Sequence, residues 1–174
     1  DGSLFALKSE LSYLWTVNIG MALENIRKWQ WINRMNEKIN RMWKYDMLTQ
    51  VLNRSGFFYC AETILQKIKE EKSNAFIIFL DIDGLKSVND NLGHEIGDAF
   101  IAKIAGILKE VVPKDCLIMR YGGDEFVVFG SCKQAGRMQR IAEDIKAAIK
   151  TADQKENRSY HLAASLGCSL HKSY

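Results

Sequence analysis

The sequence predicts an α+β fold, in which a mainly antiparallel sheet is flanked by helices and preceded by one long N-terminal helix. First, residues 3–44 contain no proline and repeat apolar residues at helical spacing. Second, the rest of the chain alternates apolar runs with amphipathic segments in the order helix, strand, helix, strand, strand, helix, strand. Without its first helix, this order is the split βαβ, ferredoxin-like (palm-type) arrangement. The 174 residues, of which 47% are hydrophobic, exclude a disordered chain.

Segment 1–45 is predicted to be a signalling or dimerisation helix resembling a coiled-coil strand. Its apolar residues recur at intervals of three and four, with shifts in phase, as in an interrupted coiled-coil seam. They are Leu4, Leu7, Leu11, Leu14, Ile19, Ala22, Ile26, Trp29, Ile32, Met35, Ile39 and Met42. One such helix cannot bury its stripe alone. It is a parallel dimerisation stalk, a helix packed on its own domain, or the last helix of a truncated upstream domain.

The second domain is predicted over residues 46–174. Helical spacing, apolar runs and turn residues delimit its elements. They are a helix over 57–72, a strand over 75–80, a helix over 100–111, strands over 116–119 and 126–129, a helix over 138–149 and a last strand over 160–169. Pro113 ends the second of these helices, and Gly122 and Gly123 form the hairpin turn.

Four acidic residues are expected to meet at one edge of this sheet. In the ferredoxin-like layout the first strand runs antiparallel to the second hairpin strand, so Asp81 and Asp83 lie beside Asp124 and Glu125. Four carboxylates repel one another unless a cation lies between them, and oxygen ligands suit Mg²⁺ or Mn²⁺. A pair of such ions can activate a hydroxyl and hold a phosphate. The cluster therefore indicates nucleotide-dependent phosphoryl transfer, and the alternative is a solvated hairpin tip.

Backbone amides add a second feature to this edge. Gly84 and the residues that follow it, beginning with Leu85, leave amides free near the carboxylates. Such amides can bind phosphate oxygens. We therefore expect Gly84 and Leu85 to contact a phosphate-bearing substrate.

Cysteines, charge and hydropathy limit the other possibilities. Cys60, Cys116, Cys132 and Cys168 form no CxxC pair and lie among apolar residues, which predicts buried, reduced thiols and a cytoplasmic protein. The net charge of +3 does not indicate a nucleic-acid partner. The longest apolar run, residues 75–80, is far shorter than the roughly 20 residues of a membrane span, so no membrane segment is expected here.

Three sequence blocks resemble those of one family. Arg120–Phe126 reads RYGGDEF, Asp46–Arg54 is similar to a DxLTxLxNR motif, and Phe79–Asp98 is similar to DxDxFKxxND followed by GHxxGD. These blocks occur in this order in the GGDEF-domain diguanylate cyclases. The resemblance covers about residues 46–169.

The resemblance implies an enzyme that condenses two GTP molecules into cyclic di-GMP and releases two pyrophosphates. It implies Mg²⁺ or Mn²⁺ as cofactor and two domains that face each other, each holding one GTP. The expected partners are GTP, a second copy of the chain joined through the N-terminal helix and across the active site, and an upstream sensor domain. The alternative is an inactive GTP-binding regulatory module.

Residue roles follow from the same resemblance. Asp81, Asp124 and the carbonyl of Ile82 correspond to metal ligands. Asp124 corresponds to the catalytic position, and Glu125 is the other signature acid beside the metals. Gly122 and Gly123 would let the turn approach the triphosphate and adopt positive φ.

Substrate recognition is implied for three further residues. Asn89 and Asp98 correspond to the pair that binds guanine, and their chemistry suits it: an amide donates and accepts, while a carboxylate accepts from the guanine N–H edge. Adenine lacks that donor pattern, so Asp98 would favour GTP over ATP. Lys86 corresponds to a basic residue beside the phosphates.

Two departures from the family pattern carry expectations of their own. Neither Arg nor Asp of the RxxD product-inhibition motif is present, because Pro113 and Cys116 stand at those positions. Feedback inhibition through that motif is therefore not expected. The domain is also expected to lack the C-terminal helix whose Lys and Arg hold the terminal phosphates. That loss would lower the affinity for GTP, because each charge-assisted contact contributes about 1.5–3 kcal/mol.

Overall fold

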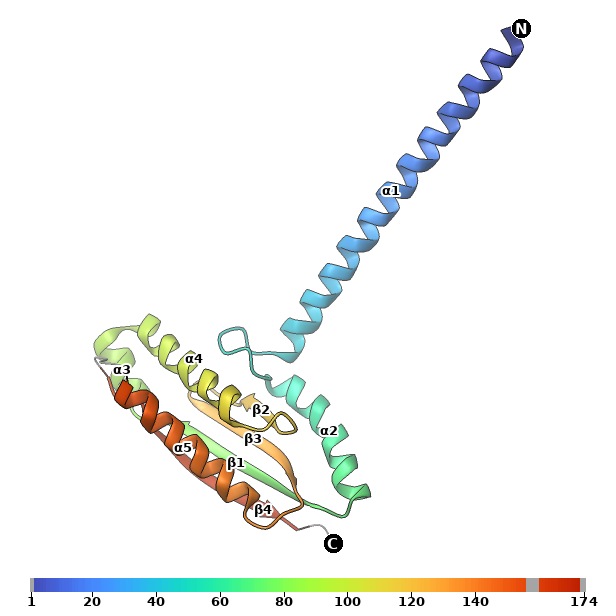
Figure 1. The fold of residues 1–174 in the computed structure, drawn as a ribbon. Coiled ribbons are helices and arrows are strands. Elements are labelled where there is room, and N and C mark those ends of the chain that lie inside the picture. Colours follow the sequence, from blue (N-terminus) through green and yellow to red (C-terminus); the bar gives the residue numbers. More distant parts are fainter. Residues whose placement is uncertain (1, 156–159, 173–174) are drawn as a thin grey trace. The chain divides into compact units, whose positions relative to one another are not determined.

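The domain is built on one four-stranded antiparallel sheet. A computed structural model describes residues 2–155 and 160–172 of the chain. The strands are β1 (Asn74–Ile82), β2 (Leu117–Arg120), β3 (Glu125–Cys132) and β4 (Ala164–His171), in the order β2-β3-β1-β4 (Figure 1). All neighbouring strands are antiparallel. The predicted α+β fold with a mainly antiparallel sheet is confirmed.

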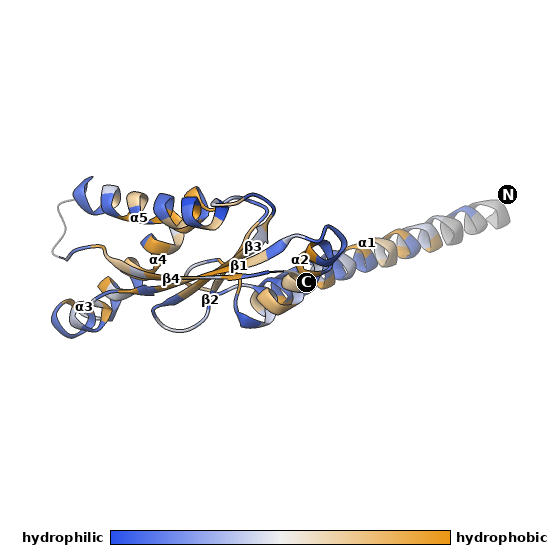
Figure 2. Cartoon of the chain, turned by 90° about the horizontal axis from the view of Figure 1, so that it is seen from below, coloured by the Kyte–Doolittle hydropathy of each residue, from blue (hydrophilic) through white to orange (hydrophobic). Residues whose placement is uncertain are grey.

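Helices cover both faces of this sheet. The helices of the domain are α2 (Arg54–Glu70), α3 (Leu85–Leu92), α4 (His94–Val111) and α5 (Arg137–Lys155). α4 and α5 lie on one face, whereas α2 lies on the other (Figures 1 and 2). The chain therefore forms a helix–sheet–helix sandwich, with hydrophobic strand residues between the layers.

The larger core lies between the sheet and the helix pair α4 and α5. Alternate residues of β1 point into it, and Phe76, Ile78 and Leu80 are at most 1% exposed. The helices contribute Phe100, Ile104, Leu108, Ile141, Ile145 and Ile149. Each fully buried side chain of this kind contributes about 1.5–3 kcal/mol. This packing makes β1 a rigid support for the acidic residues at its C-terminal end.

A smaller core lies under α2, which covers only part of the opposite face. Phe57 packs edge-on against Phe129 of β3, with ring centroids 5.9 Å apart. Val127 and Met119 complete this cluster from the strands. Asn53 caps α2 by accepting a hydrogen bond from the Gly56 amide, at 2.9 Å.

Helix α3 was not predicted from the sequence. The sequence left residues 84–93 without a helix, whereas the structure has α3 there; α4 begins at His94, six residues before the first apolar residue that predicted it. Gly84, with a φ of 75°, turns the chain out of β1. Leu85 and Val88, one helical turn apart, anchor α3 in the core. With Leu92 they form a single repeat of apolar residues at intervals of three and four, and one such repeat over eight residues is a weak signal, which explains the omission.

Helix α1 runs from Gly2 to Lys44 without interruption. The chain forms two compact units, Asp1–Arg41 and Met42–Tyr174. Within the first unit, large apolar side chains such as Ile26, Ile32 and Trp29 are about half or more exposed. Hydrophobic and hydrophilic residues are interspersed along the coloured part of α1 (Figure 2). Among the described residues, no helix has both the length and the hydrophobicity needed to cross a bilayer.

The cysteines differ in their surroundings, and the expectation that all four are buried is wrong. Cys116 and Cys132 are buried, Cys60 is partly exposed and Cys168 is exposed. Burial raises the pKa of Cys116 to about 11. Cys168 lies on β4, which is an edge strand of the sheet formed by the described residues. All four are free thiols.

Candidate active site

The pairing of β1 with β3 brings the signature acids together. Asp81 lies directly opposite Glu125 in the antiparallel register. One residue further along, the amide of Ile82 donates to the carbonyl of Asp124, at 3.1 Å. The backbone therefore places Asp81, Ile82, Asp124 and Glu125 at one edge of the sheet, as the topology predicts. Asp81 is exposed, and the other two acids are partly exposed.

Asp83 is oriented toward β4 instead of completing a four-carboxylate cluster. Its Oδ1 accepts a hydrogen bond from Ser165 Oγ at 2.8 Å, and its amide donates to the Ala163 carbonyl at 3.1 Å. Within residues 2–155 and 160–172, no three acidic, histidine or cysteine side chains converge as a metal-binding group. Of the four acids expected to meet at this edge, Asp83 is therefore not brought into the group, because it follows the end of β1 and is engaged by the neighbouring strand.

The turn between β2 and β3 is shaped by glycine, although not by positive φ. Tyr121–Asp124 connects the strands, and the Tyr121 amide donates to the Glu125 carbonyl at 2.8 Å. Neither Gly122 nor Gly123 has positive φ, so that expectation is wrong; a four-residue connection does not require the two-residue turn of that kind. A Cβ at Gly122 would lie 2.7 Å from Oε2 of Glu125, so any other residue there would displace the Glu125 carboxylate.

The segment after β1 presents uncapped amides to the same edge. Gly84 is the N-cap of α3, and no side chain caps that helix end. The amides of the first turn are therefore open to an anionic ligand. Leu85 is buried and fixes the backbone, whereas Lys86 beside it is exposed. This geometry is compatible with the phosphate contacts expected of Gly84, Leu85 and Lys86.

Asn89 and Asp98 lie on successive helices that meet at Gly93. Asn89 is partly exposed on α3, and Asp98 is exposed in the first turns of α4. The Asn89 side chain lies against Gly97, where any Cβ would overlap its amide oxygen. Asn89 therefore approaches α4 one residue before Asp98. Gly97 was not predicted as a site residue, and its only signal in the sequence is its place in the GHxxGD block.

The oxygen donors at this edge suit Mg²⁺, which takes only part of its ligands from the protein. They suit less well a metal ion whose ligands all come from the protein. Asp81 and Asp124 provide carboxylates, and Ile82 provides a carbonyl. Magnesium is usually bound by one or two carboxylates together with substrate phosphates and water. Two carboxylates on neighbouring strand ends, beside a helix end without a side-chain cap, are compatible with that pattern.

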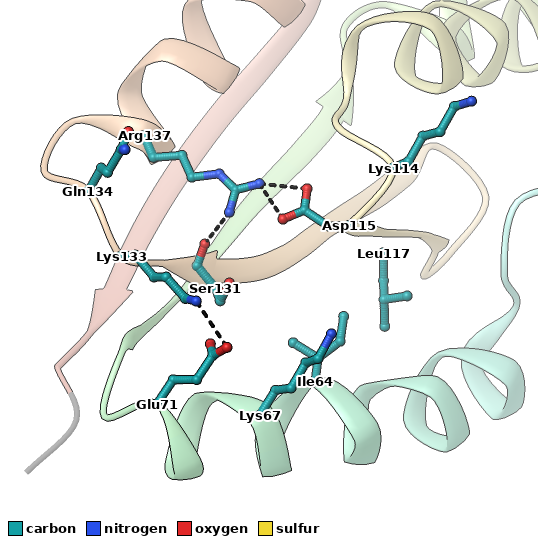
Figure 3. A pocket seen from close by; sticks show the side chains of 10 residues that line it. All are labelled: Ile64, Lys67, Glu71, Lys114, Asp115, Leu117, Ser131, Lys133, Gln134 and Arg137. Atoms are coloured by element: carbon teal, nitrogen blue, oxygen red, sulfur yellow. Dashed lines mark hydrogen bonds and ion pairs between the residues drawn. The ribbon is translucent and has the colours of Figure 1, made fainter.

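A separate cavity of about 570 Å³ lies between α2, the end of β3 and the start of α5 (Figure 3). Two ion pairs cross it: Arg137 Nη2 contacts Asp115 at 2.6 Å, and Lys133 Nζ contacts Glu71 at 2.9 Å. Hydrogen bonding to Arg137 holds the pKa of Asp115 below its ordinary value. None of the acidic-site residues lines this cavity.

The chain has relatives among curated proteins of staphylococci. An uncharacterized membrane protein of Staphylococcus epidermidis is 31% identical over 146 residues, which are 84% of this chain and 39% of the relative. An uncharacterized membrane protein of Staphylococcus aureus is 30% identical over the same shares. The chain thus spans about two-fifths of the length of these relatives.

These relatives correct one expectation drawn from the sequence. Both are named membrane proteins, so the assignment of a cytoplasmic protein is wrong. That assignment rested on reduced thiols and on the short apolar runs of these 174 residues. Such features describe this segment alone, whereas the relatives are more than twice as long.

Solved structures share the fold. The coiled coil and GGDEF domain of DgcB from Caulobacter crescentus, in complex with c-di-GMP, superimposes with a TM-score of 0.77 at 22% identity, covering 88% of this chain and 83% of that one. The GGDEF domain of YfiN (TpbB) from Pseudomonas aeruginosa has a TM-score of 0.65 at 28% identity, covering 72% and 74%. The same sheet and helix arrangement therefore occurs in both.

The family itself is established by sequence. Residues 43–174 match the family model described as diguanylate cyclase, GGDEF domain. This match includes the connecting loop, β1, the glycine turn and β4. With these elements arranged around the acidic edge, the chain belongs to the family of diguanylate cyclase GGDEF domains.

Proposed function

We propose that this domain is an active diguanylate cyclase, which joins two GTP molecules into cyclic di-GMP and releases two pyrophosphates. The observation that carries the proposal is the backbone contact between Ile82 and Asp124, which holds the signature turn against the end of β1 with Asp81 opposite Glu125. All the acidic residues of the family motif are present in that arrangement. The relation to a domain solved with c-di-GMP agrees with this fold.

In the proposed reaction, the 3′-hydroxyl oxygen of one GTP attacks the α-phosphorus of the other. A P–O bond forms, the bond to the pyrophosphate breaks, and the hydroxyl proton passes to solvent or a nearby carboxylate. Repeating the step in the opposite direction closes the ring. Asp81, Asp124 and the Ile82 carbonyl would hold Mg²⁺, which when bound neutralises phosphate charge and lowers the pKa of a coordinated hydroxyl. Glu125 lies beside them as a second acid.

The chain's own groups orient the substrate. The open amides after Gly84, with Lys86, would bind phosphate oxygens, and Gly122 and Gly123 let the turn approach them closely. Asn89 and Asp98 would bind the guanine edge, which excludes adenine because it lacks the matching donors. Each domain then holds one GTP, and the product requires a second domain.

The alternative is a GTP-binding regulatory module without turnover. It predicts that GTP binds but is not converted. The acids of the signature motif are present, together with Asn89 and Asp98. Their presence favours the active enzyme over the regulatory module. In a longer protein we expect an upstream sensor domain to control the reaction through α1.

Metal removal provides the direct test of the proposed activity. Incubating the chain with GTP and Mg²⁺ is expected to yield cyclic di-GMP and two equivalents of pyrophosphate, separated by chromatography. Excess chelator should abolish the product, and added Mg²⁺ or Mn²⁺ should restore it, because carboxylate and phosphate oxygens need a divalent ion between them. GTP binding measured by calorimetry without product would instead support the regulatory module.

The exposed stripe of α1 predicts dimerisation. Ile26 and Ile32 are 52% and 49% exposed, and the double substitution Ile26→Glu with Ile32→Glu should reduce the sedimenting mass from that of two chains to that of one. Lys38→Glu, an exposed position on the same helix that points away from both isoleucines, is the matched control and should leave a dimer. An unchanged mass in the double variant would show that α1 does not join the copies.

A further inference from the structure

The sequence of α1 fits one unbroken seven-residue repeat once its polar residues are counted. With the repeat lettered a to g from Leu4, the a positions are Leu4, Leu11, Asn18, Asn25, Ile32 and Ile39, and the d positions are Leu7, Leu14, Met21, Lys28, Met35 and Met42. The apolar residues alone shift in phase because three of these twelve positions hold Asn18, Asn25 and Lys28. A seven-residue repeat kept over residues 4–42 gives the helix one continuous seam, formed by its a and d positions.

The structure leaves this seam exposed where it describes the side chains of α1. From Leu14 to Ile39, every side chain at an a or d position is exposed. Leu14, Met21 and Ile39 are 55%, 59% and 56% exposed. A helix cannot bury such a stripe alone, and a stripe with a seven-residue period packs best against another helix with the same period. The seam therefore requires a helical partner of matching repeat.

The residues beside the seam agree with this lettering. Trp15 and Trp29 both occupy e positions, and Trp31 occupies a g position. Positions e and g border the seam, where large amphipathic side chains cover the edge of the apolar layer. The c positions, on the far side of the helix, hold Arg27, Arg34 and Arg41. Three arginines spaced one heptad apart form the solvent side that a helix in a coiled coil presents.

The two asparagines identify the partner as a second copy of α1. A side-chain amide inside a seam needs a group opposite it that both donates and accepts, because an apolar neighbour leaves it unpaired. In a parallel, in-register pair each a residue faces its own counterpart, so both asparagines find an amide. A shift by one heptad sets one asparagine of each chain against Leu11 or Ile32, and an antiparallel pair sets a positions against d positions. Among these arrangements, only the parallel, in-register pair satisfies both Asn18 and Asn25.

We propose that α1 binds α1 of a second copy as a parallel, two-stranded coiled coil whose register is set by Asn18 and Asn25. A polar residue at an a position lowers the stability of a coiled coil but selects one register and one number of chains. Lys28, at a d position, further weakens the middle of the seam because its ammonium group faces that of its counterpart. The resulting pair is two-fold symmetric. The proposal rests on the proposed function only for its effect on product formation, since the pairing itself needs no turnover.

Opposite charges at position 25 test this arrangement. Asn25→Asp and Asn25→Lys are prepared separately in the whole chain of 174 residues. Each variant alone should bind its own copy about a hundredfold more weakly and sediment with the mass of one chain, because like charges then face each other. An equal mixture of the two variants should sediment with the mass of two chains, because opposite charges then face each other. Asn40→Asp and Asn40→Lys, at a b position outside the seam, are the matched controls, and each alone should keep the mass of two chains.

Every other result of this experiment overturns the proposal. If Asn25→Asp and Asn25→Lys each keep the mass of two chains, residue 25 lies outside the seam. If both variants lose that mass and mixing does not restore it, residue 25 does not face its counterpart, as in a shifted or antiparallel pair. An unsubstituted chain that sediments with the mass of one chain would also refute the pairing.

Two single substitutions locate the seam independently. Ile32 lies at an a position and Ile26 at a b position, and both side chains are about half exposed. Ile32→Glu alone should therefore give the mass of one chain, whereas Ile26→Glu alone should keep the mass of two. The reverse result would place the seam along Ile19, Ala22, Ile26 and Trp29 and would overturn the proposal.

Product formation separates this proposal from the proposed function. If the unsubstituted chain makes cyclic di-GMP, the mixture of Asn25→Asp with Asn25→Lys should make it at least about ten times faster than either variant alone, because pairing raises the effective concentration of the second domain. If the unsubstituted chain makes none, the proposed function fails, and the sedimenting masses alone decide whether Asn25 faces its counterpart.

Discussion

Replacing Asp124 by Asn is expected to reduce cyclic di-GMP formation by about a hundredfold or more, with little change in the free energy of unfolding. The substitution preserves shape but removes the charge that the proposed metal requires. The contact of Asp124 that supports the fold is made by its backbone carbonyl, which accepts from the Ile82 amide and is kept in the variant. Initial rates with GTP and Mg²⁺, together with urea denaturation, measure the two quantities separately.

Asp90→Asn is the control for this change. Asp90 is exposed on α3, so its loss removes one negative charge near the site without touching the turn. It should retain nearly the original rate. A fully active Asp124→Asn variant would refute the metal assignment, and a variant that unfolds at much lower urea would show that Asp124 acts through stability.

Replacing Gly97 by Ala is expected to weaken GTP binding about tenfold and to reduce the preference for GTP over ATP. Gly97 is buried, and a Cβ there would occupy the space of the Asn89 side-chain oxygen. Asn89 must then rotate away from the position beside Asp98. Calorimetry with a non-hydrolysable GTP analogue and its ATP counterpart measures both effects directly.

The same helix offers a matched control at Gly106. A Cβ at Gly106 would meet nothing within 4 Å, so Gly106→Ala adds the same methyl group without displacing a neighbour. It should bind GTP normally and gain up to about 1 kcal/mol of stability from helix propensity. Equal GTP affinity in the two variants would contradict the assignment of Asn89 to guanine binding.

The parts of this molecule that depend on periodicity and topology could be predicted from its sequence. The order of the strands and the neighbourhood of Asp81 and Glu125 follow from the hydrophobic pattern and the ferredoxin-like connection rule. Helix α3 was not predicted because it is short, and only two of its side chains, Leu85 and Val88, are buried. The exposure of Cys168 could not be predicted, because an apolar run does not show that β4 pairs on one side only within the described sheet.

Features that depend on side chains meeting across long separations could not be predicted. The side chains of Asp46 and Arg120 form an ion pair although the residues are 74 positions apart, and neither residue indicates its partner. The proximity of Gly97 to Asn89 depends on the angle between two helices, which hydropathy does not encode. Asp83 turned toward Ser165 because the backbone leaves β1 one residue earlier.

The pairing of β1 with β4 has a consequence for synthesis on the ribosome. β1 is made early, yet one of its two neighbours is the last strand of the described chain. Until that strand has been synthesised, the unpaired backbone groups along one side of β1 can bond to other nascent chains. Asp83 also lacks its two partners, the Ala163 carbonyl and the Ser165 hydroxyl. An unfinished chain therefore leaves Asp83, beside the acidic edge, without the contacts that orient it until β4 has been synthesised.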